Sequence, residues 1–212
     1  GFFFKPTANK NLLPRLINKK YVCINLATDQ LELRKQDDNK IYIEKLLINI
    51  TEIIEYLILK MKYEVIFIPH TPQDLKIISK VFEYKKISRL RANISVAPLF
   101  YTETGLNIVY NLYKNSEINI CSRFHSNIIS IVTRNNFTVG FSILKRIYYL
   151  FKSIKNESNV IDVHNINLKT LKVYFKKLNK PKSKIIDKVI NKKKRETYII
   201  FKKHLNQIMN SK

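Results

Sequence analysis

Short apolar runs alternate with longer amphipathic segments along most of this chain, and the alternation limits which folds the chain can adopt. Apolar residues recur every three or four positions between the runs, most regularly over residues 43–58, which predicts amphipathic helices. Strands that alternate with helices in this way predict an α/β fold, with a doubly wound, mostly parallel sheet and helices on both faces. The runs expected to form buried strands are 21–26, 64–69, 94–97, 117–122, 137–141 and 160–163.

The remaining segments suggest how the chain is organised. Charged residues at 31–40 predict a loop, and Asn135 with Asn136 predicts a turn. No internal repeat or interdomain linker precedes residue 180, so we expect one Rossmann-like domain over residues 1–180 and a basic helical tail over 181–212. Further helices are expected at 74–82, 104–114, 123–134, 168–178 and 185–210.

Composition excludes several classes of site. The chain has only three glycines, so it lacks the glycine-rich loops that cradle phosphate or a dinucleotide. Cys23 and Cys121 lie in apolar runs and are interpreted as core residues, and the four histidines show no metal-ligand spacing. We therefore expect no metal and no bound cofactor. With no apolar run as long as a membrane span, a reducing, cytoplasmic setting fits best.

The formal charge of +23 suggests a polyanionic partner. Lysine is enriched together with asparagine and isoleucine, and the codons of all three are rich in A and T. The base composition of the gene can therefore explain the lysine excess, and nucleic acid is the less favoured partner. An anionic substrate or membrane surface fits better. Aromatic residues 148–151 among basic ones suit base stacking, although a packed helix is the simpler interpretation. The basic run 191–195 suits lipid headgroups, although a solvated helix face is simpler.

Polar side chains follow three of the expected strands. The carboxyl ends of strands in a doubly wound sheet face one crevice, so residues far apart in sequence are expected to meet there. The candidates are His70 with Asp74, Thr102 with Glu103, and Ser122 with Arg123 and His125.

The last of these groups carries the strongest chemical signal. Arg123 and His125 stand where a strand gives way to a helix, whose free N–H groups and positive dipole end favour anions. Arg123 is expected to hold a carboxylate or phosphate, and His125 to transfer a proton. The alternatives are a surface ion pair for Arg123 and a backbone hydrogen bond for His125. The alternative for His70 is a residue that caps a loop, and for Asp74 it is a helix cap. The alternative for Glu103 is an ordinary exposed carboxylate.

One motif consists of a strand followed by Arg123-Phe124-His125 at a helix start, with Val139-Gly140-Phe141-Ser142 after the next turn. With this motif, residues 20–180 resemble the polysaccharide pyruvyl transferases, specifically their carboxyl-terminal half, which is one half of a B-type glycosyltransferase fold. Upstream, residues 65–70 followed by Asp74 are similar to the family's strand, proline and histidine. Residues 160–163 before an amphipathic helix also fit.

The resemblance implies transfer of the enolpyruvyl unit of phosphoenolpyruvate to a saccharide acceptor as a ketal, in the synthesis of surface polysaccharide. It makes His125 the catalytic residue and Arg123 a ligand of the donor's phosphate or carboxylate. The substrate-binding set expected with them is Ser122, His70, Asp74, Glu103 and Lys145.

Family members also have an amino-terminal domain that contributes to the cleft. The resemblance therefore predicts that this chain is a fragment, an inactive copy or one partner of a missing domain or subunit. The expected location is cytoplasmic or peripheral to the inner face of the membrane. Two rival hypotheses remain open, a half-domain of a nucleotide-sugar glycosyltransferase and a non-catalytic module that binds nucleic acid or a membrane surface.

Overall fold

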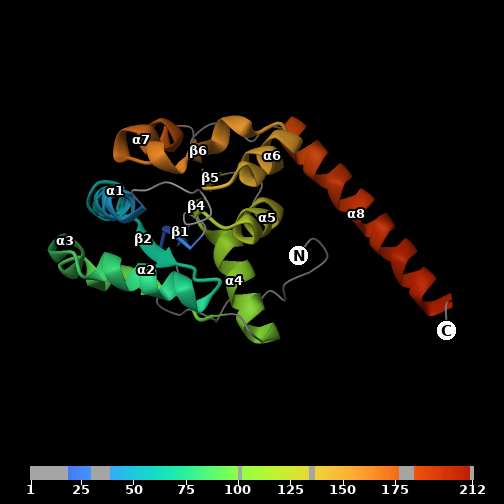
Figure 1. Ribbon diagram of the computed structural model, residues 1–212, viewed down its shortest axis with the longest axis horizontal. Helices are drawn as coiled ribbons and strands as arrows, with labels where there is room; N and C mark the ends of the chain where they lie inside the picture. Colours follow the sequence, from blue (N-terminus) through green and yellow to red (C-terminus); the bar gives the residue numbers. More distant parts are fainter. Residues whose placement is uncertain (1–18, 30–38, 100–101, 134–136, 177–183, 211–212) are drawn as a thin grey trace.

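The alternation of strands and helices in the sequence becomes a parallel sheet covered on both faces (Figure 1). The computed structural model describes residues 19–29, 39–99, 102–133, 137–176 and 184–210. The predicted charged loop at 31–40 lies largely outside these ranges. The predicted turn at 135–136 and the predicted boundary between the domain and the tail also lie outside them. The strands are β1 (Tyr21–Asn25), β2 (Glu64–Phe67), β3 (Ile94–Val96), β4 (Ile118–Cys121), β5 (Thr138–Ser142) and β6 (Val160–Asp162).

Within the described residues the sheet has the order β3-β2-β1-β4-β5-β6, and each neighbouring pair is parallel. The predicted doubly wound, parallel fold is confirmed. The order reverses between β1 and β4, so the loops that leave these two strands diverge to opposite faces and leave a crevice at their carboxyl ends. The register places Asn25, at the end of β1, opposite Cys121, at the end of β4.

A helix follows each strand, and the predicted helical segments match the observed helices closely. The basic aromatic stretch after β5 is a helix, as its simpler interpretation predicted, with Phe151 buried but Tyr148 and Tyr149 exposed. The helices are α1 (Asn39–Leu59), α2 (Pro72–Phe82), α3 (Lys85–Ser88), α4 (Glu103–Asn115), α5 (Phe124–Thr133), α6 (Lys145–Ser153), α7 (Leu168–Phe175) and α8 (Lys184–Asn210). Short 3-10 turns are η2 (Arg91–Asn93), η3 (Glu157–Asn159) and η4 (Val163–Asn165).

Alternate residues of the strands supply two separate cores. Val22 and Ile24 face a core formed with α1, α2 and α7, whereas Cys23 faces a second core formed with α4. Side chains alternate between the faces of a strand, so a strand covered on both sides is apolar throughout. Cys23 and Cys121 are buried free thiols, which confirms their interpretation as core residues.

Helix α8 departs from this arrangement of a sheet between two layers of helices. Its first turns pack through Ile190 against α5 and α6, and Lys194 donates a hydrogen bond from Nζ to the carbonyl of Val132 at 3.1 Å. Beyond this contact the helix projects away from the sheet (Figure 1). No helix in the described ranges combines the length and hydropathy needed to span a bilayer.

Candidate active site at the strand-order reversal

The candidate site lies at the carboxyl ends of β1 and β4, where the strand order reverses. Ser122, the residue after β4, donates to the carbonyl of Asn25 from its backbone N–H at 3.1 Å and from Oγ at 2.9 Å. These bonds extend the β1–β4 pairing by one residue and hold the turn that leads into α5. The turn therefore starts from a rigid position beside the crevice.

Asn25 links the elements around this turn, although its side chain is completely buried. Its Oδ1 accepts hydrogen bonds from the Arg123 N–H at 2.9 Å and from Ser126 Oγ at 2.8 Å. Its Nδ2 donates to the carbonyl of Ile68 at 2.9 Å and to Asp74 Oδ2 at 3.3 Å. One amide thus ties β1 to the ends of β2 and β4, and sequence analysis missed it. The available signal was a polar residue within an otherwise apolar strand.

Two more side chains that sequence analysis missed complete the strand-to-helix turn. Ser126 Oγ donates to the Arg123 carbonyl at 2.7 Å as well as to Asn25. Asn127 Nδ2 donates to the carbonyls of Cys121 and Arg123, at 3.0 and 2.8 Å. Because a buried polar group without a partner is costly, these bonds favour this one path of the backbone. The signal in the sequence is the polar pair that directly follows His125.

Arg123 is held by two carboxylates. Its Nε donates to both oxygens of Asp74, at 2.9 and 3.0 Å, and its Nη2 lies 2.6 Å from Asp74 Oδ1. The same Nη2 lies 3.0 and 3.1 Å from the oxygens of Asp29 and donates to Thr71 Oγ1 at 2.9 Å. Sequence analysis paired neither carboxylate with Arg123 and missed Asp29 and Thr71 altogether.

The two carboxylates differ in burial. The side chain of Arg123 is 11% exposed, that of Asp74 0% and that of Asp29 39%. Burial by itself would lower the pKa of Arg123, but hydrogen bonding and attraction to Asp74, with a further contribution from Asp29, raise it above its usual value. The guanidinium stays charged, and most of its donors are taken. No hydrogen bond to Nη1 is found among the described residues, so Nη1 is the part left for a ligand.

His70 is part of the same hydrogen-bonded network. Its backbone N–H donates to Asp74 Oδ2 at 2.8 Å, and its Nε2 lies 3.0 Å from the hydroxyl oxygen of Tyr113 on α4. Burial lowers the pKa of His70 to about 3, with further lowering by the charges of Arg123 and His125. The ring is therefore neutral near pH 7 and supplies no proton there. Asp74 lies in the first turn of α2, where its negative charge also interacts favourably with the positive end of the helix dipole.

His125 lies in the first turn of α5, and its side chain is exposed. Its ring meets the ring of Phe124 edge-on, with the centroids 6.0 Å apart. The Arg146 guanidinium lies over the same Phe124 ring, at 5.5 Å from its centroid. Lys145 precedes Arg146 in the first turn of α6 and is exposed. The starts of α5 and α6 together form a basic rim, in which sequence analysis had not included Arg146.

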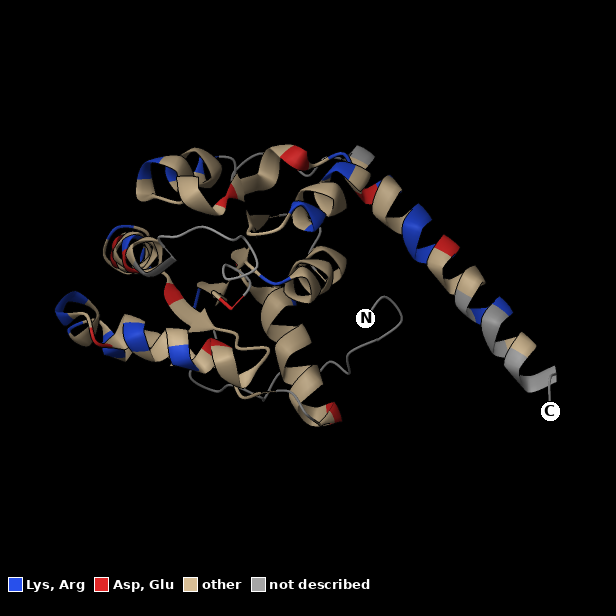
Figure 2. Ribbon diagram, viewed as in Figure 1, with Lys and Arg blue, Asp and Glu red and all other residues tan. Residues whose placement is uncertain are grey.

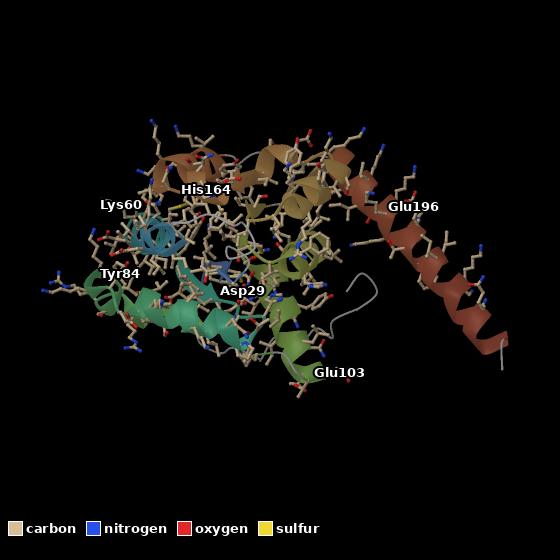
Figure 3. The ribbon with its side chains drawn as sticks, in the orientation of Figure 1. Asp29, Lys60, Tyr84, Glu103, His164 and Glu196 are labelled. Carbon is tan, nitrogen blue, oxygen red and sulfur yellow. The ribbon has the colours of Figure 1, made fainter. Side chains whose placement is uncertain are left out.

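Glu103 does not join this group. Thr102 caps α4 by accepting a hydrogen bond at Oγ1 from the Gly105 N–H at 3.1 Å, and Glu103 is exposed in the first turn. Figure 3 shows Glu103 at the outer end of α4, well separated from Asp29 at the centre. The expected proximity was wrong for Thr102 and Glu103 because α4 begins at the end of the helix that lies away from Asp29 (Figure 3). A substrate-binding role for Glu103 stays a prediction.

A small hollow adjoins the Arg123–Asp29 ion pair. It has a volume of about 240 Å³ and lies between the loop after β1 and helices α1 and α2. In the part of the chain that the structure describes, no three His, Cys, Asp or Glu side chains gather in a way that suits a metal ion. The residues around the hollow are Thr28, Asp29, Ile43, Gln73, Lys76, Ile77 and Lys80.

No family model, curated protein or solved structure matches this chain. The resemblance to the pyruvyl transferases therefore rests on the residues that suggested it. The geometry nevertheless limits which reactions this site can carry out. The site combines a half-buried histidine with a lowered pKa, an exposed histidine, an arginine held by two carboxylates and a rim of two further cations.

Proposed function

We propose that this chain is a pyruvyl-transferase-like domain that binds phosphoenolpyruvate at the carboxyl ends of β1 and β4. The observation that carries the proposal is the rigid Ser122–His125 turn at the strand-order reversal, with His125 exposed beside a basic rim. The donor's phosphate and carboxylate would meet the first turns of α5 and α6, Lys145 and the Nη1 group of Arg123. Helix starts and fixed cations are the groups that bind such anions in proteins.

The chemistry fits the same residues. Formation of the ketal begins with a proton added to the terminal carbon of the enol, which leaves an oxocarbenium-like centre at the neighbouring carbon. One sugar hydroxyl attacks that carbon and releases its proton. Phosphate then leaves with the C–O bond electrons, and a second hydroxyl closes the ketal and releases its proton. An exposed imidazole such as His125 can transfer the first proton, whereas nearby cations stabilise the departing phosphate.

Arg123 has a second task in this proposal. Because Asp74 accepts hydrogen bonds from both Nε and Nη2 of the guanidinium, the side chain cannot swing toward a ligand. We infer that Arg123 chiefly positions the turn that carries His125 and offers the donor only Nη1. The acceptor would approach from a second domain or subunit that completes the cleft. We place the reaction in the cytoplasm, because phosphoenolpyruvate is a cytoplasmic metabolite.

Calorimetry with phosphoenolpyruvate tests the proposal. We expect one donor per chain, with binding about 1.4–5-fold weaker in Lys145→Ala, since an exposed charge contributes about 0.2–1 kcal/mol. Lys152→Ala is a matched control, because Lys152 is exposed in the last turn of the same helix. Its donor affinity should equal that of the unmodified chain. Absence of phosphoenolpyruvate binding, or an equal loss in both variants, contradicts the proposal.

Two rival functions give different results in the same experiment. Binding of a uridine diphosphate sugar in place of phosphoenolpyruvate favours the glycosyltransferase half-domain, for which the strand order is equally suitable. Steeply salt-dependent binding of DNA that is unchanged in Lys145→Ala and His125→Ala favours a nucleic-acid module.

A further inference from the structure

Helix α8 presents a basic face that the proposed reaction does not use. Over its 27 residues the helix has eight lysines and arginines and two acidic residues. Among the described side chains of this helix, those that pack against the body lie at its inner end, with Ile190 and its neighbours. At 1.5 Å per residue the helix is about 40 Å long, so much of it extends beyond the sheet (Figure 1).

The cations of α8 are not spread evenly around the helix. Basic residues at steps of three and four share one face, and every member of that face is exposed. Figure 2 shows the resulting basic segments along the projecting helix. The nearest acid, Glu196, lies 3.8 Å from Lys192 and offsets one charge. The basic face consists of Lys188, Lys192, Arg195 and Lys202.

Apolar side chains are exposed within and beside this basic face. Ile199, which lies between Arg195 and Lys202, is 65% exposed, and Ile200 is 57% exposed. Tyr198 is 54% exposed. A branched aliphatic side chain has neither polar atoms nor a π face, so it adds little to contact with nucleic acid. At a membrane interface the same side chain enters the boundary between headgroups and acyl chains.

We propose that the basic face of α8 binds an anionic phospholipid surface, with Ile199 inserted among the headgroups. The complementarity is electrostatic, because cations near an anionic leaflet each strengthen binding. It is also steric, because this face lies opposite the side of α8 that packs on α5 and α6. A flat surface can therefore contact the basic face without touching the body. This inference is independent of the proposed donor site.

Co-sedimentation of the full chain with vesicles tests this inference. The vesicles contain phosphatidylcholine alone or with 30% phosphatidylserine, and we expect binding to the anionic vesicles only. Alanine at all four positions of the basic face should weaken binding by at least about 100-fold, at roughly fivefold for each cation. Ile199→Ser should weaken binding to the anionic vesicles severalfold, and the binding that remains should be more sensitive to salt.

A matched variant distinguishes binding through the basic face of α8 from binding through the net charge of the whole chain. Alanine at four exposed lysines of the body removes the same charge and should weaken vesicle binding by no more than a few-fold. Equal losses in the two fourfold variants overturn the inference, as does failure to bind anionic vesicles. Tighter binding of single-stranded RNA than of vesicles also overturns it. The body positions are Lys80, Lys114, Lys152 and Lys169.

Discussion

Substituting the two carboxylates that hold Arg123 should affect stability very differently, because one is buried and the other is not. Asp74 is 0% exposed and accepts hydrogen bonds from His70, Asn25, Thr71 and Arg123. In Asp74→Asn the largely buried guanidinium of Arg123 loses the buried one of its two counter-charges, and breaking a buried ion pair typically costs about 3–5 kcal/mol. Asp29 is 39% exposed, and a pair of that kind contributes about 0.2–1 kcal/mol.

Urea denaturation followed by far-UV circular dichroism at pH 7 measures both effects. We expect Asp74→Asn to lower the free energy of unfolding by about 3 kcal/mol or more, with an unchanged slope against urea. For a domain of this size that corresponds to roughly 6–20 °C in Tm, against at most about 4 °C for Asp29→Asn. Added salt should reduce the Asp29 effect and leave the Asp74 effect nearly intact.

The comparison has a clear contrary outcome. If the two variants lose the same stability, or if Asp74→Asn loses less than about 1 kcal/mol, burial does not decide the strength of this network. Arg123 would then be free to reorient toward a ligand. Its assignment as the residue that positions the turn would fail with it.

Three further predictions concern the surroundings of the site. His70 binds a proton more weakly when folded, with a pKa of about 3 against 6.5. The free energy of unfolding from urea titrations should therefore decrease as the pH is lowered from 6.5 to 4, by up to about 1.4 kcal/mol per pH unit, and should decrease less in His70→Asn. A Cβ in Gly140→Ala would lie 2.8 Å from Phe151 and 3.0 Å from Ile147, both fully buried, which should cost about 1–3 kcal/mol in thermal unfolding. Asn25→Ala should cost about 2–4 kcal/mol in the same assay, because it leaves several buried donors and acceptors without partners; a loss below 1 kcal/mol contradicts its linking role.

Much of the fold could be predicted because each element is specified by nearby residues. The apolar runs became β1, β2, β4 and β5 within one or two residues of the predicted bounds, and the period of residues 43–58 became α1. The Ser122–His125 segment was expected at a strand-to-helix junction and lies there. These features depend on periodicity and on the preference of polar residues for strand ends, both of which are local.

The partners within the site could not be predicted in the same way. Arg123 was expected to offer its charge to a ligand, yet Asp74 and Asp29 take most of its donors. The Asn25 amide bonds a turn 98 residues later in the chain. Nothing local distinguishes Asn25 from any other polar residue at the end of a strand. Its role becomes visible only when β1 and β4 are placed side by side.

By itself, then, the sequence determined the alternation of elements, the parallel α/β class and the polar turn after β4. The strand order β3-β2-β1-β4-β5-β6 was decided only by tertiary packing, and with it the meeting of Asn25, Asp74 and Arg123. The physical reason is that periodicity reports which side of an element is buried, but not which element buries it. Tertiary packing also placed His70 in the network around Asp74 and lowered the pKa of its ring, and the departure of α8 from the sheet left its basic face open.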